Sequence, residues 1–121
     1  MRAVRSTGTT PEMSARALLS AAGAPSCEVN VPGLPGRPDI VFRRERLAVF
    51  VNGCFWHGCP RCRLPRPRVN AAFWAAKLDR NARRDIEVCR ALQEADWRVA
   101  TIWECAIDEG VAAVLLLLGS P

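Results

Sequence analysis

The chain has 121 residues, half of them apolar, with 17 basic and 12 acidic side chains, one histidine and six cysteines. This length suits one compact domain over residues 1–121, and the apolar content excludes both a disordered tail and a disulfide-rich miniprotein. The longest apolar run, Val111 to Leu118, is too short to cross a bilayer, so we expect a cytoplasmic protein with no membrane partner.

A helix is predicted near the N-terminus. Thr10 suits the N-cap, Pro11 the first helical position and Glu12 the first turn, and the helix is expected to end near Gly23. Apolar residues then alternate at positions 27, 29 and 31, which predicts a strand with one buried face. The Pro- and Gly-rich residues 32–38 predict a turn region.

Two short apolar runs, 40–42 and 47–51, are separated by four charged residues and predict a β-hairpin. Residues 52–68 are rich in Gly, Pro and Cys and have no periodicity, so we expect an irregular loop.

A long helix is expected over 71–95, with Asn70 as its cap, followed by a strand over 97–103. A last helix is expected to open at Asp108 and end at Gly119. A strand, a long helix and a second strand imply a parallel pair, so the predicted fold is α/β, with a mixed sheet flanked by helices in the order αβββαβα. The expected buried side of the long helix comprises Phe73, Trp74, Leu78, Ile86, Cys89 and Leu92.

Basic residues are concentrated in one segment. Between Arg61 and Arg90 there are nine basic and three acidic residues, whereas the rest of the chain has eight basic and nine acidic ones. All but one of the basic residues are arginine, whose guanidinium binds phosphates bidentately. The segment therefore indicates a nucleic-acid partner, with an arginine-rich codon usage as the alternative explanation.

Four of the cysteines have the spacing of a zinc site. Cys54, Cys59 and Cys62 form C-x4-C-x2-C, and Cys105 follows the last predicted strand. Thiolates in a chain expected to be cytoplasmic favour a metal over disulfides, so we predict a saturated structural Zn²⁺ site in a loop over 52–68, the alternative being scattered thiols. His57 could replace one thiolate. Cys27 and Cys89 are expected in the core.

Three residues suggest acid–base and metal chemistry. Asp39 begins a strand beside the exposed turn, where a carboxylate can hold Mg²⁺, and Glu12 could approach the same place. His57 is the sole imidazole, so it is the expected proton carrier near neutral pH. The adjacent aromatics Phe55 and Trp56, near a basic segment, fit insertion between bases; packing over the zinc site is the alternative.

Separated blocks of the sequence carry a family resemblance. These are Pro35-Gly-Arg-Pro-Asp-Ile40, Asn52-Gly-Cys-Phe-Trp-His-Gly-Cys-Pro-Arg-Cys62, Trp97-Arg-Val and Trp103-Glu-Cys105. Together they closely resemble the very-short-patch-repair mismatch endonucleases (Vsr type). The resemblance implies a restriction-endonuclease-like αβββαβ core with a structural zinc. It also implies Mg²⁺-dependent nicking of duplex DNA on the 5′ side of the T in a T:G mismatch that arises from deamination of 5-methylcytosine.

The resemblance also implies roles for individual residues. Asp39 and the backbone carbonyl of Val51 are implied to hold Mg²⁺, with Glu12 and His57 as catalytic residues and the four cysteines as zinc ligands. Phe55 and Trp56 are implied to insert beside the mismatch. The resemblance and the charge pattern together give the expected contacts with DNA. Besides Phe55 and Trp56, these are Met1, Arg37, Arg61, Arg63, Arg66 and Arg68. We expect a monomer in the bacterial cytoplasm, at the nucleoid when working, with mismatch-repair matchmaker proteins as further candidate partners.

Two departures from the family pattern matter. Asn52 stands where some members have a second histidine, so it can position water or phosphate but cannot take up a proton. The chain also begins at the methionine of the family's Asn-Met-Arg-Ala-like stretch, so it lacks the family's basic N-terminal arm. We expect either that the start site is truncated or that this member grips DNA less. A non-catalytic zinc-containing DNA-binding module and a restriction-type nuclease on paired DNA are therefore kept as alternatives.

Overall fold

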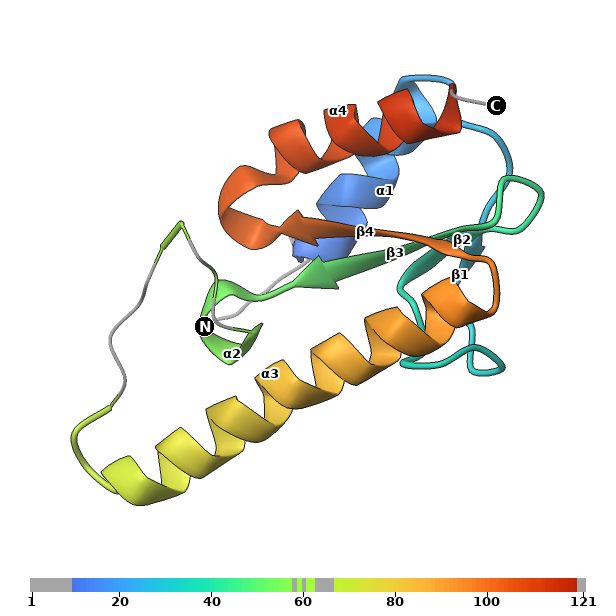
Figure 1. The fold of residues 1–121 in the computed structure, drawn as a ribbon. Helices are drawn as coiled ribbons and strands as arrows, with labels where there is room; N and C mark the ends of the chain where they lie inside the picture. The colour runs from blue at the N-terminus through green and yellow to red at the C-terminus, as the bar shows by residue number, and fades with distance from the viewer. Residues whose placement is uncertain (1–9, 58, 60, 63–66, 120–121) are drawn as a thin grey trace.

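The computed structural model describes residues 10–57, 59, 61–62 and 67–119. Within these ranges the elements follow the predicted order, with a short helix added after the third strand and a 3-10 turn added after the fourth (Figure 1). The elements are α1 (Pro11–Ala21), β1 (Glu28–Val29), β2 (Ile40–Phe42), β3 (Leu47–Asn52), α2 (Cys54–His57), α3 (Ala71–Glu94), β4 (Arg98–Trp103), a 3-10 turn η1 (Glu104–Ala106) and α4 (Ile107–Leu118).

The strands form one mixed sheet in the order β1-β2-β3-β4, which confirms the predicted mixed α/β class. The pairs β1–β2 and β2–β3 are antiparallel, and β3 and β4 are parallel, with Val49 opposite Ala100. Helix α3 makes the crossover between the two parallel strands, as the spacing of the elements requires.

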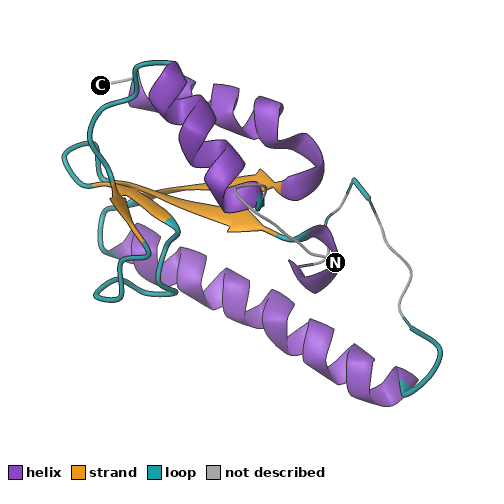
Figure 2. Cartoon of the chain, turned by 180° about the vertical axis from the view of Figure 1, so that it is seen from behind, coloured by secondary structure: helices purple, strands orange, loops and turns teal. Residues whose placement is uncertain are grey.

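Helices cover both faces of this sheet. Helices α1 and α4 lie together on one face and α3 runs along the other (Figures 1 and 2). Alternate strand residues therefore enter two different cores. The core beneath α1 and α4 contains Ile40, Phe42, Leu47, Val49 and Ile102, and the core beneath α3 contains Val41, Ala48, Leu92 and Trp97.

Several arginines outside the basic segment have structural partners. Arg46 donates to the carbonyls of Ala95 and Asp96 at the C-terminal end of α3, and its guanidinium lies over the Trp97 ring. Arg98 donates to the Leu117 carbonyl near the end of α4. A cation near unpaired carbonyls at a helix C-terminus is stabilising. Part of the arginine content therefore serves the fold.

The structure corrects four local predictions. Asn70 precedes α3 but has left-handed backbone and makes no side-chain cap bond. Phe73 and Ile86 are 58% and 60% exposed instead of buried, because the side of α3 that faces the sheet follows Leu78, Asp85 and Leu92. Cys27 is exposed, since β1 is a two-residue strand at the sheet edge.

The fourth correction concerns the segment predicted to be an irregular loop. Residues 54–57 form the short helix α2, and Asn52 completes β3. No helix in the described part of the chain is long and apolar enough to span a membrane.

The turn before β2 requires glycine at one position. Gly36 has φ of +75°, and a Cβ there would lie 2.5 Å from Val88 Cγ1 on α3. We predict that Gly36→Ala lowers the free energy of unfolding by about 1–3 kcal/mol, because the substitution adds both backbone strain and a clash.

The matched control is Gly33→Ala in the same turn, where a Cβ meets nothing within 4 Å. Urea unfolding of both variants checks the prediction. Equal stabilities would show that the turn does not pack tightly on α3.

Candidate active site and cysteine cluster

A cavity of about 420 Å³ brings together residues from the β2–β3 hairpin, α2 and α3. The predicted residues Asp39, Val51, Asn52 and His57 all line it, and so does Arg37 from the turn before β2. Helix α3 contributes the polar side chains of Asn81, Arg84 and Asp85 to the lining, and Thr101 comes from β4.

Asp39 is held against strand β3. Its Oδ2 atom accepts a hydrogen bond of 2.7 Å from the Val51 backbone N–H. Burial raises the pKa of Asp39 above its ordinary value, and the opposing effects of the Val51 N–H and the nearby His57 do not cancel this. In an extended strand the N–H and C=O of one residue point the same way, so the Val51 carbonyl also faces the Asp39 side. A carboxylate and a backbone carbonyl on the same side of β3 are oxygen donors of the kind that could hold a hard cation.

His57 is oriented by a carboxylate from another element. Its Nδ1 lies 2.7 Å from Asp85 Oδ2 on α3, with both side chains part-exposed. A carboxylate at Nδ1 fixes the ring orientation and favours the tautomer with its proton on that nitrogen. The Nε2 atom then remains available to accept a proton from a ligand in the cavity.

Sequence reasoning missed Asp85, although a signal existed. Asn81, Asp85 and Val88 recur at helical spacing and continue the side of α3 that Leu78 and Leu92 bury against the sheet. Polar residues within an otherwise buried stripe often mark a site. Cys89, expected in the core, lines the cavity and is only part-buried.

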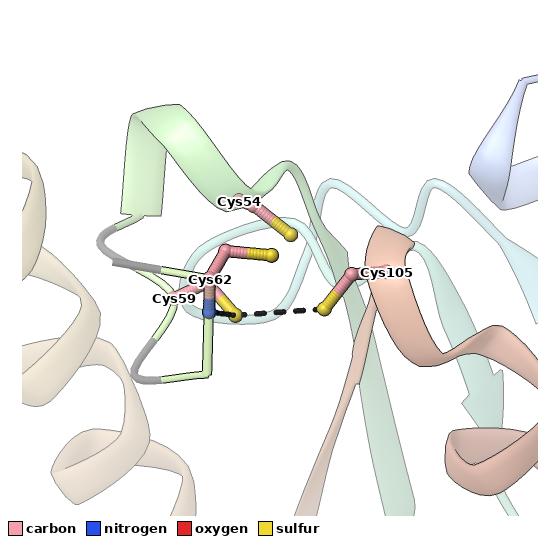
Figure 3. A group of neighbouring side chains, drawn as sticks. All are labelled: Cys54, Cys59, Cys62 and Cys105. Carbon is pink, nitrogen blue, oxygen red and sulfur yellow. Dashed lines mark hydrogen bonds between the residues drawn. The ribbon is translucent and has the colours of Figure 1, made fainter. Parts of the chain in front are cut away.

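The four cysteines of the predicted zinc site lie together. Figure 3 shows their sulfur atoms directed at a common centre, with Cys54 at the start of α2 and Cys105 after β4. The Sγ atoms of Cys54, Cys59, Cys62 and Cys105 are all within 4.8 Å of one another, and those of Cys59 and Cys105 are 3.6 Å apart. Zn–S bonds of about 2.3 Å in a tetrahedron place sulfurs about 3.8 Å apart, so the cluster could hold a metal ion.

The thiols of this cluster have shifted acidities. Burial raises the pKa of the Cys54 thiol to about 12. Burial acts in the same direction on Cys59, but the amide N–H groups of Cys62 and Arg61 and the neighbouring thiols outweigh it and lower the pKa to about 7. One readily formed thiolate beside a buried thiol is a set of donors that a cation would stabilise.

Two carboxylates attach the cluster to its surroundings. The Cys54 N–H donates to Glu104 Oε1 at 2.8 Å, so the start of α2 is bonded to the residue before Cys105. Arg61 makes a bidentate pair with Glu109 on α4, at 3.0 and 2.9 Å. Arg61, predicted to contact DNA, therefore has a protein partner in this structure.

The remaining predicted residues are distributed as follows. Glu12 does not line the cavity, and its carboxylate lies 3.9 Å from Arg16 Nε. Arg68 is exposed just before α3. Phe55 and Trp56 belong to α2, but their side chains lie outside what the structure describes, as do residues Met1, Arg63 and Arg66.

The cavity combines carboxylates, an imidazole and guanidinium groups beside a cysteine cluster on a mixed α/β sheet. This set of groups is typical of enzymes that hydrolyse phosphate esters, nucleases among them.

Comparison with known sequences specifies the class. The profile of the family described as DNA mismatch endonuclease Vsr matches residues 1–63. The chain is 41% identical over 111 residues to the type II nicking enzyme V.XorIIP of Xanthomonas oryzae pv. oryzae, covering 90% of this chain and 79% of that protein. It is 39% identical to the type II nicking enzyme V.NaeI of Lentzea aerocolonigenes, over 95% of this chain and 72% of the relative.

It is also 38% identical to the DNA mismatch endonuclease Vsr of Escherichia coli, over 88% of this chain and 68% of that enzyme. The chain belongs to the Vsr family of DNA mismatch endonucleases, and it is an endonuclease that acts on DNA.

The raised pKa of Asp39 predicts a pH-dependent effect of Asp39→Asn on stability. A carboxyl group whose folded-state pKa is raised stabilises the fold when protonated, and this contribution is lost as pH rises through the folded pKa. An asparagine oxygen can still accept from the Val51 N–H but never becomes charged. In magnesium-free buffer, Asp39→Asn should therefore gain stability relative to the parent as the pH rises above about 4, the ordinary pKa of an aspartate, until the parent carboxyl is fully ionised.

Thermal melts of both proteins across this pH range check the sign. A parent protein that gains stability relative to Asp39→Asn as pH rises would contradict the assigned effect of burial.

Proposed function

We propose that this endonuclease nicks duplex DNA on the 5′ side of the T in a T:G mismatch, in a reaction that depends on Mg²⁺. Asp39 and the Val51 carbonyl would hold the ion, which supplies positive charge at the phosphate and lowers the pKa of water. The observation that supports this proposal is the 2.7 Å hydrogen bond from the Val51 N–H to Asp39, because the Val51 carbonyl is expected on the same side of β3 as that carboxylate.

His57 is the proposed proton carrier. A water molecule gives up a proton and its oxygen bonds to phosphorus, while the bond from phosphorus to one deoxyribose oxygen breaks and that leaving oxygen takes up a proton. His57 assists one of these proton transfers through Nε2 while Asp85 holds Nδ1, a contribution of typically ~10²–10⁴-fold in rate. Asn52 lines the same cavity and can orient water or phosphate oxygen through its amide.

Recognition of the mismatch is proposed for α2. Phe55 and Trp56 lie in the sequence between Cys54 of the cluster and His57 of the cavity, so aromatics inserted into the base stack from here would act next to the cleaved strand. Unstacking costs less at a mismatched pair, which makes such insertion selective. The proposed partner is thus T:G-mismatched duplex DNA, with matchmaker proteins as further candidates.

Two structural elements complete the proposal. The cysteine cluster is proposed to bind one Zn²⁺ in a saturated, structural role, supported by its four converging sulfurs. The core is proposed to be of the restriction-endonuclease type, supported by a mixed sheet in which Asp39 precedes β2 and Val51 lies on β3. Glu12 remains a proposed catalytic residue, although it does not line the cavity.

Nicking assays on duplexes that differ at one base pair test this function. We predict nicking of a T:G duplex with Mg²⁺, much weaker nicking of the T:A duplex, and none without divalent cation. Asp39→Asn should keep DNA affinity but lose nicking by about 10²-fold or more, because a metal ligand contributes several kcal/mol to the transition state.

The control is Asp96→Asn, which makes the same chemical change at an exposed residue outside the cavity and at a left-handed position that asparagine tolerates. Equal nicking of T:G and T:A duplexes would indicate a restriction-type nuclease. Mg²⁺-independent binding without any nicking would indicate a non-catalytic module, and either result would reject the proposal.

A further inference from the structure

Two arginines line the cavity that holds Asp39 and His57. Arg37 comes two residues before Asp39, and Arg84 directly precedes Asp85 on α3. Neither guanidinium makes a hydrogen bond or ion pair with any residue in the described ranges. Arg43 and Arg61, by contrast, each pair with a glutamate.

The turn that carries Arg37 is packed against the helix that carries Arg84. Arg37 has φ of +50°, an uncommon left-handed conformation for a side chain of this size. The preceding residue, Gly36, approaches Val88, which lies one helical turn after Arg84. Strained backbone persists where the surrounding packing imposes it, and it is common at functional sites.

The cavity lining has two carboxylates and two guanidinium groups, so the arginines balance the negative charge of the aspartates. Asp39 and Asp85 carry two negative charges when ionised, and a phosphodiester brings a third. At short range in a partly desolvated site, this repulsion would exclude DNA from the reactive groups. The two guanidinium groups of Arg37 and Arg84 offset the carboxylates and leave the cavity able to accept a phosphate.

We propose that Arg37 and Arg84 form a guanidinium clamp on the non-bridging oxygens of the phosphate that is cleaved, Arg37 from the turn and Arg84 from α3. Guanidinium groups match phosphate oxygens bidentately. Negative charge accumulates on these oxygens as the water oxygen bonds to phosphorus and the bond to the deoxyribose oxygen breaks, so the clamp stabilises the transition state most. This inference rests on the proposed function, because it takes this cavity as the site of nicking.

Single-turnover nicking of a T:G duplex with saturating enzyme and Mg²⁺ tests Arg84. We expect Arg84→Ala to lower the rate roughly 10²–10³-fold, the loss typical of one preorganised charge-stabilising donor. Arg84→Lys should recover only part of it, since an ammonium group cannot bind bidentately. Arg83→Ala is the control, since Arg83 is the neighbouring exposed arginine of α3 and is outside the lining.

Arg37 is tested with Arg37→Gly, because glycine adopts positive φ without strain and thermal melting can confirm that the variant folds. Binding is then measured to a duplex with a neutral methylphosphonate at the cleaved position. The parent should bind this duplex more weakly than the natural one, whereas Arg37→Gly and Arg84→Ala should discriminate much less between the two.

The outcomes separate this inference from the function on which it rests. If Asp39→Asn abolishes nicking but Arg84→Ala and Arg37→Gly nick at the parental rate when saturated, the clamp is rejected and the active site stands. If the two arginine variants only weaken affinity, and do so equally for natural and methylphosphonate duplexes, they are general backbone contacts and the clamp is again rejected. If Asp39→Asn nicks normally, the proposed active site itself fails.

Discussion

A helix of four residues has too few internal hydrogen bonds to be stable by itself, yet α2 is what places His57 in the cavity. Both of its ends are fixed from outside. Cys54 belongs to the cysteine cluster and donates its N–H to Glu104, while His57 bonds to Asp85 on α3. The position of the imidazole therefore depends on contacts that reach the end of β4 on one side and α3 on the other.

The regular part of the fold could be predicted from the sequence because each element repeats a simple pattern. Thr10 and Pro11 mark the start of α1, and the two apolar runs on either side of four charged residues form the β2–β3 hairpin. The parallel pairing of β3 with β4 followed from the long helix between them. The bounds of helices and strands can be predicted from local sequence because capping and the spacing of apolar residues involve positions that are close in the chain.

The candidate site was predictable only in part. Spacing and resemblance indicated Asp39, His57 and the four cysteines, but Asp85 and Glu104 act through contacts with residues far away in the sequence. Helix α2 was missed for the same reason, since tertiary contacts and not its own composition hold it. The sequence likewise could not separate the structural arginines from those at the site. Arg46 and Arg98 bind helix-end carbonyls, whereas Arg37 and Arg84 line the cavity.

If the cysteine cluster binds Zn²⁺ as proposed, the metal fixes Cys54 and, through α2, the imidazole of His57. NMR of the imidazole tests this dependence directly, because the chain has a single histidine. His57 resonances would be recorded at fixed pH in zinc-loaded protein, after chelation and after zinc is restored, with amide resonances of β2 and β3 reporting the fold. We expect chelation to shift the imidazole resonances and to weaken the signature of the Nδ1 hydrogen bond, reversibly, while the strand amides change little. Unchanged imidazole resonances in folded, zinc-free protein would contradict it.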